Sequence, residues 1–340
     1  MKPIRTFKSV LGAALLAAVA SHAAAQEVVT LRVHHFLPPA SNAQAKMIEP
    51  WCAKIGKESA GRLKCQIYPA MQLGGSPPQL FDQAKDGVAD IVWTLQGYQA
   101  GRFLATEVFE LPFMVASSEK ASPALWNYVM KHAQDEYKGV KPLIFHLIPG
   151  TQLHTTNKQI KTLADFKGLK LRAPNRMATR LVTALGATPV PMPVPQVPES
   201  LSKGVIDGAV LPWEVIPALK VHEIVKFHTE TEGPFIATSA FVFAMNPAKY
   251  ESLPADLKKV IDANSGADTS AWAGKVWDSV TAPARDLAVA RKNTFHTVPA
   301  AEVAHWHKAA DTVVAEWVKE VAARGLDGQK LIKEAKSLMN

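Results

Sequence analysis

The sequence predicts an α/β protein built from two units, each with an open and mostly parallel sheet. Strand-like and helix-like segments alternate in two successive runs, which is typical of parallel sheets covered by helices. The chain of 340 residues also exceeds the size at which single cores stop growing. Since no Gly/Ser-rich linker separates the two runs, we expect units that share crossing strands rather than separate domains joined by a flexible linker.

The first run has the pattern β-α-β-α-β. Its strand segments alternate or are continuously apolar, and its helical segments place apolar residues three and four apart with a glycine at the end. A proline in the first turn supports the second helix, because its missing N–H is harmless there. The expected elements are strand 29–36, helix 42–61, strand 62–69, helix 77–87 and strand 88–93.

The second run repeats the pattern and ends in helices. For the proline-rich stretch 189–198 we favour a strand, a turn and a helix with Pro195 in its first turn over a polyproline ligand. From Leu253 onward the Ala-, Lys- and Glu-rich composition predicts helices that could brace both units. The expected elements before them are strand 141–150, strand 168–174, helix 175–187, strand 188–193, a helix around 195–203, strand 205–212 and strand 239–246.

The N-terminus predicts export. Lys2, Arg5 and Lys8 precede an apolar run over 10–20 and the small tripeptide 23–25, as in a secretory signal peptide. Because no later stretch approaches about 18 uninterrupted apolar residues, the mature chain is expected to begin near Gln26 and to be soluble in the periplasm. Without those three cations the formal net charge falls from +8 to 8 − 3 = +5, and the scattered bases do not indicate nucleic-acid binding.

The chain has two cysteines, Cys52 and Cys65. We favour a disulfide over free thiols, because an exported protein meets an oxidising environment. No histidine pair stands beside them at ligand spacing, so a metal site is not predicted.

Four motifs typical of hydrolases and nucleotide-binding enzymes are missing from the sequence. It contains no G-x-S-x-G, H-E-x-x-H, phosphate-binding G-x-x-x-x-G-K-[ST] or G-x-G-x-x-G pattern. His305 and His307 lie two apart and diverge on a helix, and His222 and His228 show no better site pattern, so we interpret them as surface residues. A hydrolase or isomerase is therefore the weakest functional hypothesis.

One cation ends a predicted strand. Arg172 is the last charged residue of "GLKLRAP", and this stretch alone favours a solvent-exposed face. However, ligands of open α/β sheets bind beyond the carboxyl ends of strands, where Phe36, Trp93 and Leu211 are also expected. A cation among large apolar groups favours a small-molecule site.

Several segments together resemble the solute-binding proteins of TRAP (tripartite ATP-independent periplasmic) transporters. They occur in that family's order and spacing over most of 29–246: "GRLKCQIYPAMQLGG", "LFDQAKDGVADIVW", "FELPFM", "TTNKQIKTLADFKGLKLRAPN", "LGATPVPMP" and "GVIDGAV". The resemblance implies a type II-like periplasmic clamshell with crossing strands and a long domain-spanning helix. It implies capture of an organic acid for membrane subunits, with no catalysis and no cofactor. The expected ranges are 1–25 for the signal peptide, 26–149 plus 238–277 for domain I and 150–237 plus 278–340 for domain II.

The resemblance also implies ligand contacts. In this family the arginine that matches Arg172 forms a salt bridge with the ligand carboxylate, which a guanidinium suits because it donates two parallel hydrogen bonds. Sialic acid binders have a second arginine where this chain has Gln152, and an asparagine where it has Leu211. Phe36 replaces a polar residue, and Trp213 is expected beside the same cleft.

Each of these positions has a structural alternative. Phe36, Trp93, Leu211 and Trp213 are each compatible with the hydrophobic core. Asn175 is as compatible with a helix cap as with a ligand contact.

We therefore expect a binder of an organic monocarboxylate with an apolar body, preferably an aromatic 2-oxo or 2-hydroxy acid. A C4-dicarboxylate or an aliphatic 2-oxo acid is the alternative. A dicarboxylate would need a second cation, for which Arg32, Arg102 and Arg176 are candidates.

Overall fold

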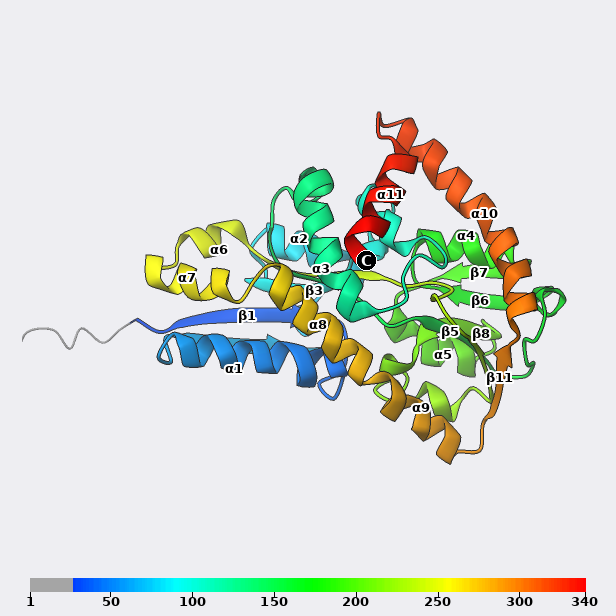
Figure 1. Cartoon of the computed structure of the whole chain (residues 1–340). Coiled ribbons are helices and arrows are strands. Elements are labelled where there is room, and N and C mark those ends of the chain that lie inside the picture. Colours follow the sequence, from blue (N-terminus) through cyan, green and yellow to red (C-terminus); the bar gives the residue numbers. More distant parts are fainter. Residues whose placement is uncertain (1–26) are drawn as a thin grey trace, which may run out of the picture.

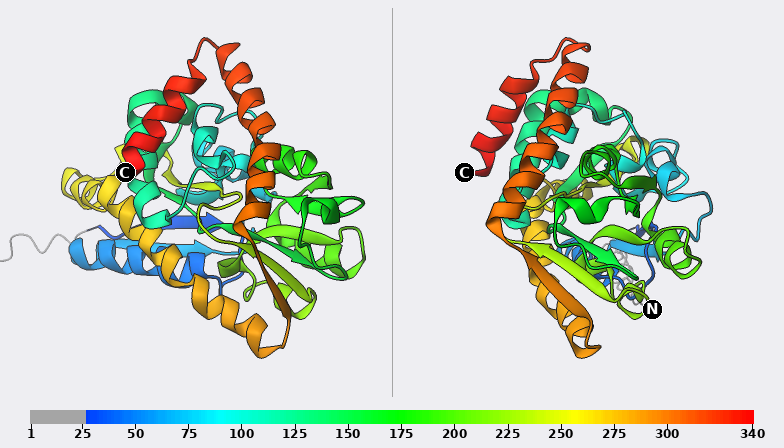
Figure 2. Two further views of the ribbon diagram at one scale, coloured as in Figure 1. Left: turned by 45° about the vertical axis from the view of Figure 1, so that its right-hand side comes forward. Right: turned by 90° about the vertical axis from the view of Figure 1, so that its right-hand side faces the viewer.

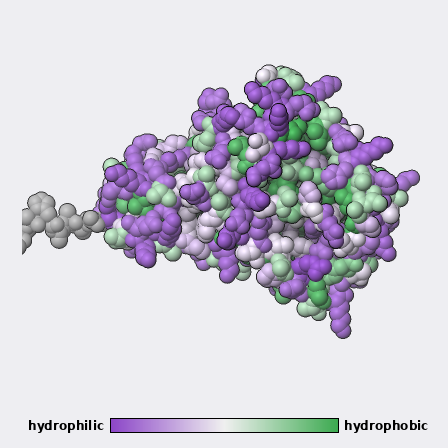
Figure 3. Space-filling model, viewed as in Figure 1, coloured by the Kyte–Doolittle hydropathy of each residue, from purple (hydrophilic) through white to green (hydrophobic). Residues whose placement is uncertain are grey.

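The computed structural model describes residues 27–340 and contains two sheets, each with its own helices (Figure 1). The predicted signal peptide, 1–25, lies outside the described residues. No helix within 27–340 combines the length and the apolar composition that a membrane crossing requires. The face of the molecule in Figure 3 is mostly hydrophilic, with small scattered apolar areas.

The first sheet has the strand order β2-β1-β3-β10-β4. Its strands β1, β2 and β3 are parallel, whereas β10 is antiparallel to both of its neighbours. The strand bounds are β1 Val29–His35, β2 Leu63–Tyr68, β3 Ile91–Leu95, β4 Lys141–Leu147 and β10 Ala240–Met245. The accompanying helices are η1 Ala43–Ile48, α1 Glu49–Glu58, α2 Leu80–Lys85, α3 Ser118–Tyr128, α6 Pro247–Glu251, α7 Ala255–Ala263 and α8 Ala267–Ser279. We call this sheet with these helices the first unit.

The second sheet has the order β11-β9-β5-β8-β6-β7, in which β5 is antiparallel to both neighbours. The strand bounds are β5 Thr151–Thr155, β6 Lys170–Ala173, β7 Thr188–Pro191, β8 Gly208–Pro212, β9 Phe227–Thr231 and β11 Thr294–Val298. Its helices are α4 Arg176–Ala184, α5 Val197–Ser202, α9 Thr281–Ala290 and α10 Ala300–Ala322. We call this sheet with these helices the second unit.

The chain passes between the two units several times, as the resemblance implied. β4 of the first sheet leads directly to β5 of the second, and β9 returns to β10. The helices α8 and α9 then run from one unit to the other, with a break at Val280 (Figures 1 and 2). The expected long helix is therefore two helices in succession. The final helix α11, Gly328–Met339, returns to pack against α3 of the first unit.

Most of the helices and strands predicted from the sequence pattern are confirmed, with two corrections. The strands β5, β9 and β11 were not predicted, and β11 interrupts a region for which only helices were expected. His305 and His307 are exposed as predicted, but His228 is buried. Its ring meets that of His154 through a hydrogen bond of 2.7 Å between the two Nδ1 atoms. Burial lowers the pKa of both rings, which keeps them neutral.

Cys52 of α1 and Cys65 of β2 form the predicted disulfide, which fastens the first helix to its neighbouring strand. No group of three or more His, Cys, Asp or Glu side chains within 27–340 has the arrangement of a metal site. The domain ranges given above stay a prediction.

Candidate functional site

A narrow cavity of about 30 Å³ lies between the two units. Both units and both strand crossings contribute to its wall. The first unit and the crossings supply Phe36, Leu37, Trp93, Leu95, Tyr98, Ile148, Ser239 and Phe241, and the second unit supplies Thr151, Arg172, Pro174, Val194, Leu211, Pro212, Glu214 and Val215.

One wall of this cavity is a stack of aromatic rings. The ring of Phe36 stacks on Trp93 with centroids 5.0 Å apart, and Trp93 stacks on Phe241 at 4.5 Å. Behind them, His146 Nε2 accepts a hydrogen bond from Trp93 Nε1 at 2.8 Å, and burial lowers the pKa of this histidine to about 3. The neutral imidazole thus fixes the indole, so the wall presents a rigid apolar surface.

Arg172 is the cation of the cavity and is only 2% exposed. Its Nε donates to the Met192 carbonyl oxygen and its Nη1 to that of Val210, both at 3.1 Å. Nη2 has no hydrogen-bond partner, and no carboxylate of residues 27–340 forms an ion pair with the guanidinium. Burial accordingly lowers the pKa of Arg172 from its ordinary value, although an arginine stays charged. A buried cation without a counter-ion favours an anionic ligand.

The Tyr98 hydroxyl lies beside this guanidinium, a contact that sequence reasoning missed. Tyr98 is in a short 3-10 turn, Gln96–Tyr98, after β3, and its Oη accepts a hydrogen bond from the Val194 N–H at 2.8 Å. Burial raises the pKa of this phenol, and the neighbouring Arg172 charge partly opposes the rise. Because Oη acts as an acceptor toward Val194, its proton remains available for donation to an anion.

Glu214 is a second residue that sequence reasoning missed. It follows β8 in the turn Trp213–Val215, lines the cavity and is 5% exposed. Burial raises the pKa of its carboxyl to about 8, so this group is mainly protonated at neutral pH.

The cavity contains some of the predicted site residues but not others. Phe36, Trp93, Arg172 and Leu211 line it. The Trp213 indole instead packs against the rings of His154, His228 and Phe295, and its Nε1 donates to Glu230 at 3.0 Å. A ligand contact by Trp213 therefore has no support in this arrangement.

Gln152 and Asn175 also lie outside the cavity lining. The Gln152 side chain accepts a hydrogen bond from the Thr231 N–H at 3.3 Å. Asn175 caps α4 by accepting from the Ala178 N–H at 2.8 Å, and its Nδ2 donates to Ser239 Oγ at 3.2 Å. Of the two interpretations of Asn175, the geometry matches the helix cap.

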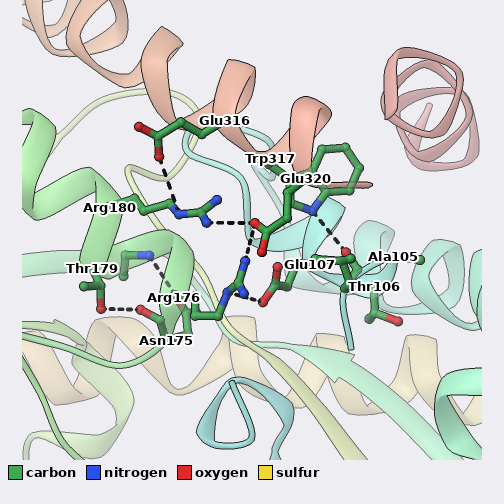
Figure 4. Close-up of polar contacts among 12 residues, drawn as sticks. Ala105, Thr106, Glu107, Asn175, Arg176, Thr179, Arg180, Glu316, Trp317 and Glu320 are labelled. Atoms are coloured by element: carbon green, nitrogen blue, oxygen red, sulfur yellow. Dashed lines mark hydrogen bonds and ion pairs between the residues drawn. The ribbon is translucent and has the colours of Figure 1, made fainter. Parts of the chain in front are cut away.

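The three candidates for a second cation are engaged elsewhere. Arg32 pairs with Asp90 and Arg102 with Asp82. Arg176 pairs with Glu107 at 3.0 Å and with Glu320 of α10, in an ion cluster that also contains Arg180 (Figure 4). Among the lining residues of the described chain, Arg172 is the one Lys or Arg. The charge and the apolar lining of the site therefore suit a single carboxylate attached to an apolar body.

The comparisons with known proteins agree with this geometry. Residues 33–320 match the family described as bacterial extracellular solute-binding protein, family 7, DctP. The fold is similar to that of a TRAP solute-binding protein from Rhodoferax ferrireducens T118 that contains copurified benzoate. The two chains are 49% identical, with a TM-score of 0.90 over 92% of this chain and 98% of that one.

Two further structures are informative. A marine metagenome TRAP solute-binding protein, described as specific for aromatic acid ligands and crystallised with 3-hydroxybenzoate, is 47% identical with a TM-score of 0.90, covering 92% of this chain and 98% of that one. A TRAP protein from Bordetella bronchiseptica with bound (R)- and (S)-mandelate is 27% identical with a TM-score of 0.85 at the same coverage.

Proposed function

The chain belongs to the bacterial extracellular solute-binding proteins of family 7, and we propose that it captures an aromatic monocarboxylate for a TRAP transporter. The main support is the buried Arg172 guanidinium, whose unpaired Nη2 shares a cavity with stacked aromatic rings. The guanidinium binds the carboxylate, Tyr98 donates to it, and the ring of the acid packs against Phe36. The three similar proteins contain benzoate, 3-hydroxybenzoate and mandelate, which all combine one carboxylate with one aromatic ring.

The cavity argues against the dicarboxylate alternative. A second carboxylate would need its own cation, but Arg32, Arg102 and Arg176 all pair with carboxylates of the protein outside the cavity. A small aliphatic 2-oxo acid would leave the aromatic wall without a partner.

We further propose that the protein acts in the periplasm after removal of residues 1–25, and that it hands the acid to membrane subunits unchanged. The basic, apolar and small-residue order of the N-terminus supports export. Family membership and the transporter proteins among its structural neighbours support a binding role.

The test uses the mature chain, 26–340, refolded from denaturant to remove copurified ligand. Calorimetric titration with benzoate, 3-hydroxybenzoate, mandelate, succinate and pyruvate should give heat of binding with at least one aromatic acid and a much weaker response to the other two. Tight succinate binding without aromatic binding would refute the proposal. Chromatography of the recovered acid checks that it is unchanged.

A further inference from the structure

Glu214 has the features of a ligand-binding residue. Glu214 lines the cavity that contains Arg172 and is only 5% exposed. Oε2 has no hydrogen-bond partner within the described residues, and the carboxyl forms no ion pair there. Burying such a group without a partner is costly, so its presence in an otherwise apolar wall calls for an explanation.

The backbone around Glu214 is fixed by the opposite unit. Asn42 of the first unit donates its Nδ2 proton to the Glu214 carbonyl oxygen at 2.9 Å. This hydrogen bond holds the turn Trp213–Val215 over the cavity when the two units are together. The turn that carries this carboxyl is therefore held in the arrangement in which both units line the cavity.

The surroundings of Glu214 favour its neutral form. Burial raises the pKa of its carboxyl to about 8. A neutral carboxylic acid offers one O–H donor and an acceptor oxygen, and a hydroxyl group offers the same pair. An unsubstituted ring edge offers neither.

We propose that Glu214 is a specificity-determining residue that binds a hydroxyl substituent on the aromatic ring of the ligand, which makes hydroxylated aromatic monocarboxylates the preferred class. This inference rests on the proposed function, since it assumes that Arg172 binds the carboxylate of the same molecule. The ring lies along the aromatic wall between the two polar groups. The wall excludes water, so a ligand without the hydroxyl leaves Glu214 unpaired.

The experiment compares ligands of equal size with and without a donor. Calorimetry measures the Kd values of the 2-, 3- and 4-hydroxybenzoates and of the corresponding methylbenzoates for the wild type, Glu214→Gln and Glu214→Met. Exposed Glu223 supplies the matched control, Glu223→Met. The wild type should prefer the hydroxy acid at one ring position by about tenfold or more. Glu214→Gln, which keeps a donor and an acceptor, should retain this preference, and Glu214→Met should lose it while still binding the methyl acid.

The outcomes separate this inference from the proposed function. If the wild type binds aromatic acids but prefers no hydroxy isomer over its methyl counterpart, the role of Glu214 is wrong and the proposed function stands. An unchanged preference for the hydroxy acid in Glu214→Met would likewise show that the role of Glu214 is wrong and leave the proposed function standing. If Glu214→Met does not fold, loss of the preference in Glu214→Gln contradicts the inference, and its retention supports it. If no aromatic acid binds the wild type, the proposed function itself fails.

Discussion

Replacing Arg172 by methionine removes the cavity's cation while keeping an unbranched apolar side chain. The guanidinium is 2% exposed, and two of its three nitrogens donate to backbone carbonyl oxygens. The third, Nη2, has no partner in the described chain. The substitution should therefore have different effects on ligand binding and on the stability of the ligand-free protein.

For binding, the loss is that of charge-assisted hydrogen bonds to a carboxylate. Each contributes about 1.5–3 kcal/mol, so two of them contribute roughly 3–6 kcal/mol. At 1.4 kcal/mol for each factor of ten, Arg172→Met should raise the Kd for an aromatic acid by about 10²–10⁴.

For stability, two opposing effects nearly cancel. The Met192 and Val210 carbonyl oxygens lose a donor, at a cost of about 1–3 kcal/mol each. Removal of a buried charge without a counter-ion returns a desolvation penalty of several kcal/mol. The melting temperature of the ligand-free variant should thus lie within about 5 °C of the wild-type value.

The assay is calorimetric titration with benzoate beside thermal unfolding of the ligand-free proteins. Arg291→Met, at an exposed arginine, is the matched control and should match the wild type in both measurements. A Kd for Arg172→Met within threefold of the wild type would refute the assigned role. A large drop in the melting temperature of ligand-free Arg172→Met would show that Arg172 stabilises the fold.

Three further predictions concern the aromatic wall, the disulfide and the buried Glu110 carboxyl. Phe36→Ala should weaken benzoate binding by about tenfold or more but pyruvate binding much less in calorimetry, since it removes a ring of the aromatic wall; equal losses would assign Phe36 to the fold alone. Replacing Cys52 and Cys65 by alanine should lower the free energy of unfolding in urea by about 3 kcal/mol, given their separation of 13 residues, whereas unchanged unfolding would contradict the loop-entropy argument. Burial raises the pKa of the Glu110 carboxyl to about 8, so the folded state holds this proton more tightly than the unfolded chain. The free energy of unfolding in urea, measured from pH 5 to 9, should therefore fall for the wild type as pH rises through about 8. This fall should be a few kcal/mol larger than in Glu110→Gln. Equal pH dependence of the two proteins would exclude the titration of Glu110 as the cause.

The sequence predicted those elements whose apolar pattern is set by their own sheet. β1, β3 and β10 bury nearly continuous or alternating apolar residues, and their patterns predicted them. Two of the missed strands, β5 and β9, contain polar residues that are buried against distant partners. In β5 and β9, His154 and His228 are fully buried because their rings bond to each other, and such a pair has no local signal. The alternation of polar and apolar residues along either strand does not reveal this histidine pair.

The site was predictable where it depended on strand ends. Arg172 and Leu211 lie near such ends and line the cavity as expected. The family resemblance placed Trp213, after β8, beside the same cleft, but the turn that follows β8 directs this indole to His154 and leaves the next residue, Glu214, in the cavity lining. A one-residue difference in a 3-10 turn cannot be deduced from composition. The sequence also gave no signal for Tyr98, which joins the site through a turn after β3.

The buried cation connects ligand capture to closure of the clamshell. Bringing the units together places Arg172 of the second unit against the aromatic wall of the first, away from water and without a protein counter-ion. The polar contacts that join the units are modest. In the Arg176–Glu107 ion pair the Glu107 side chain is buried and the Arg176 side chain is 24% exposed, so the cost of desolvation offsets much of the attraction. The carboxylate of the ligand instead offsets much of the cost of keeping the guanidinium away from water, as it is in this arrangement of the two units. Because a ligand shifts a conformational equilibrium by its differential affinity for the two states, an acid that pairs with Arg172 favours the closed form, and an uncharged analogue of the same shape does not.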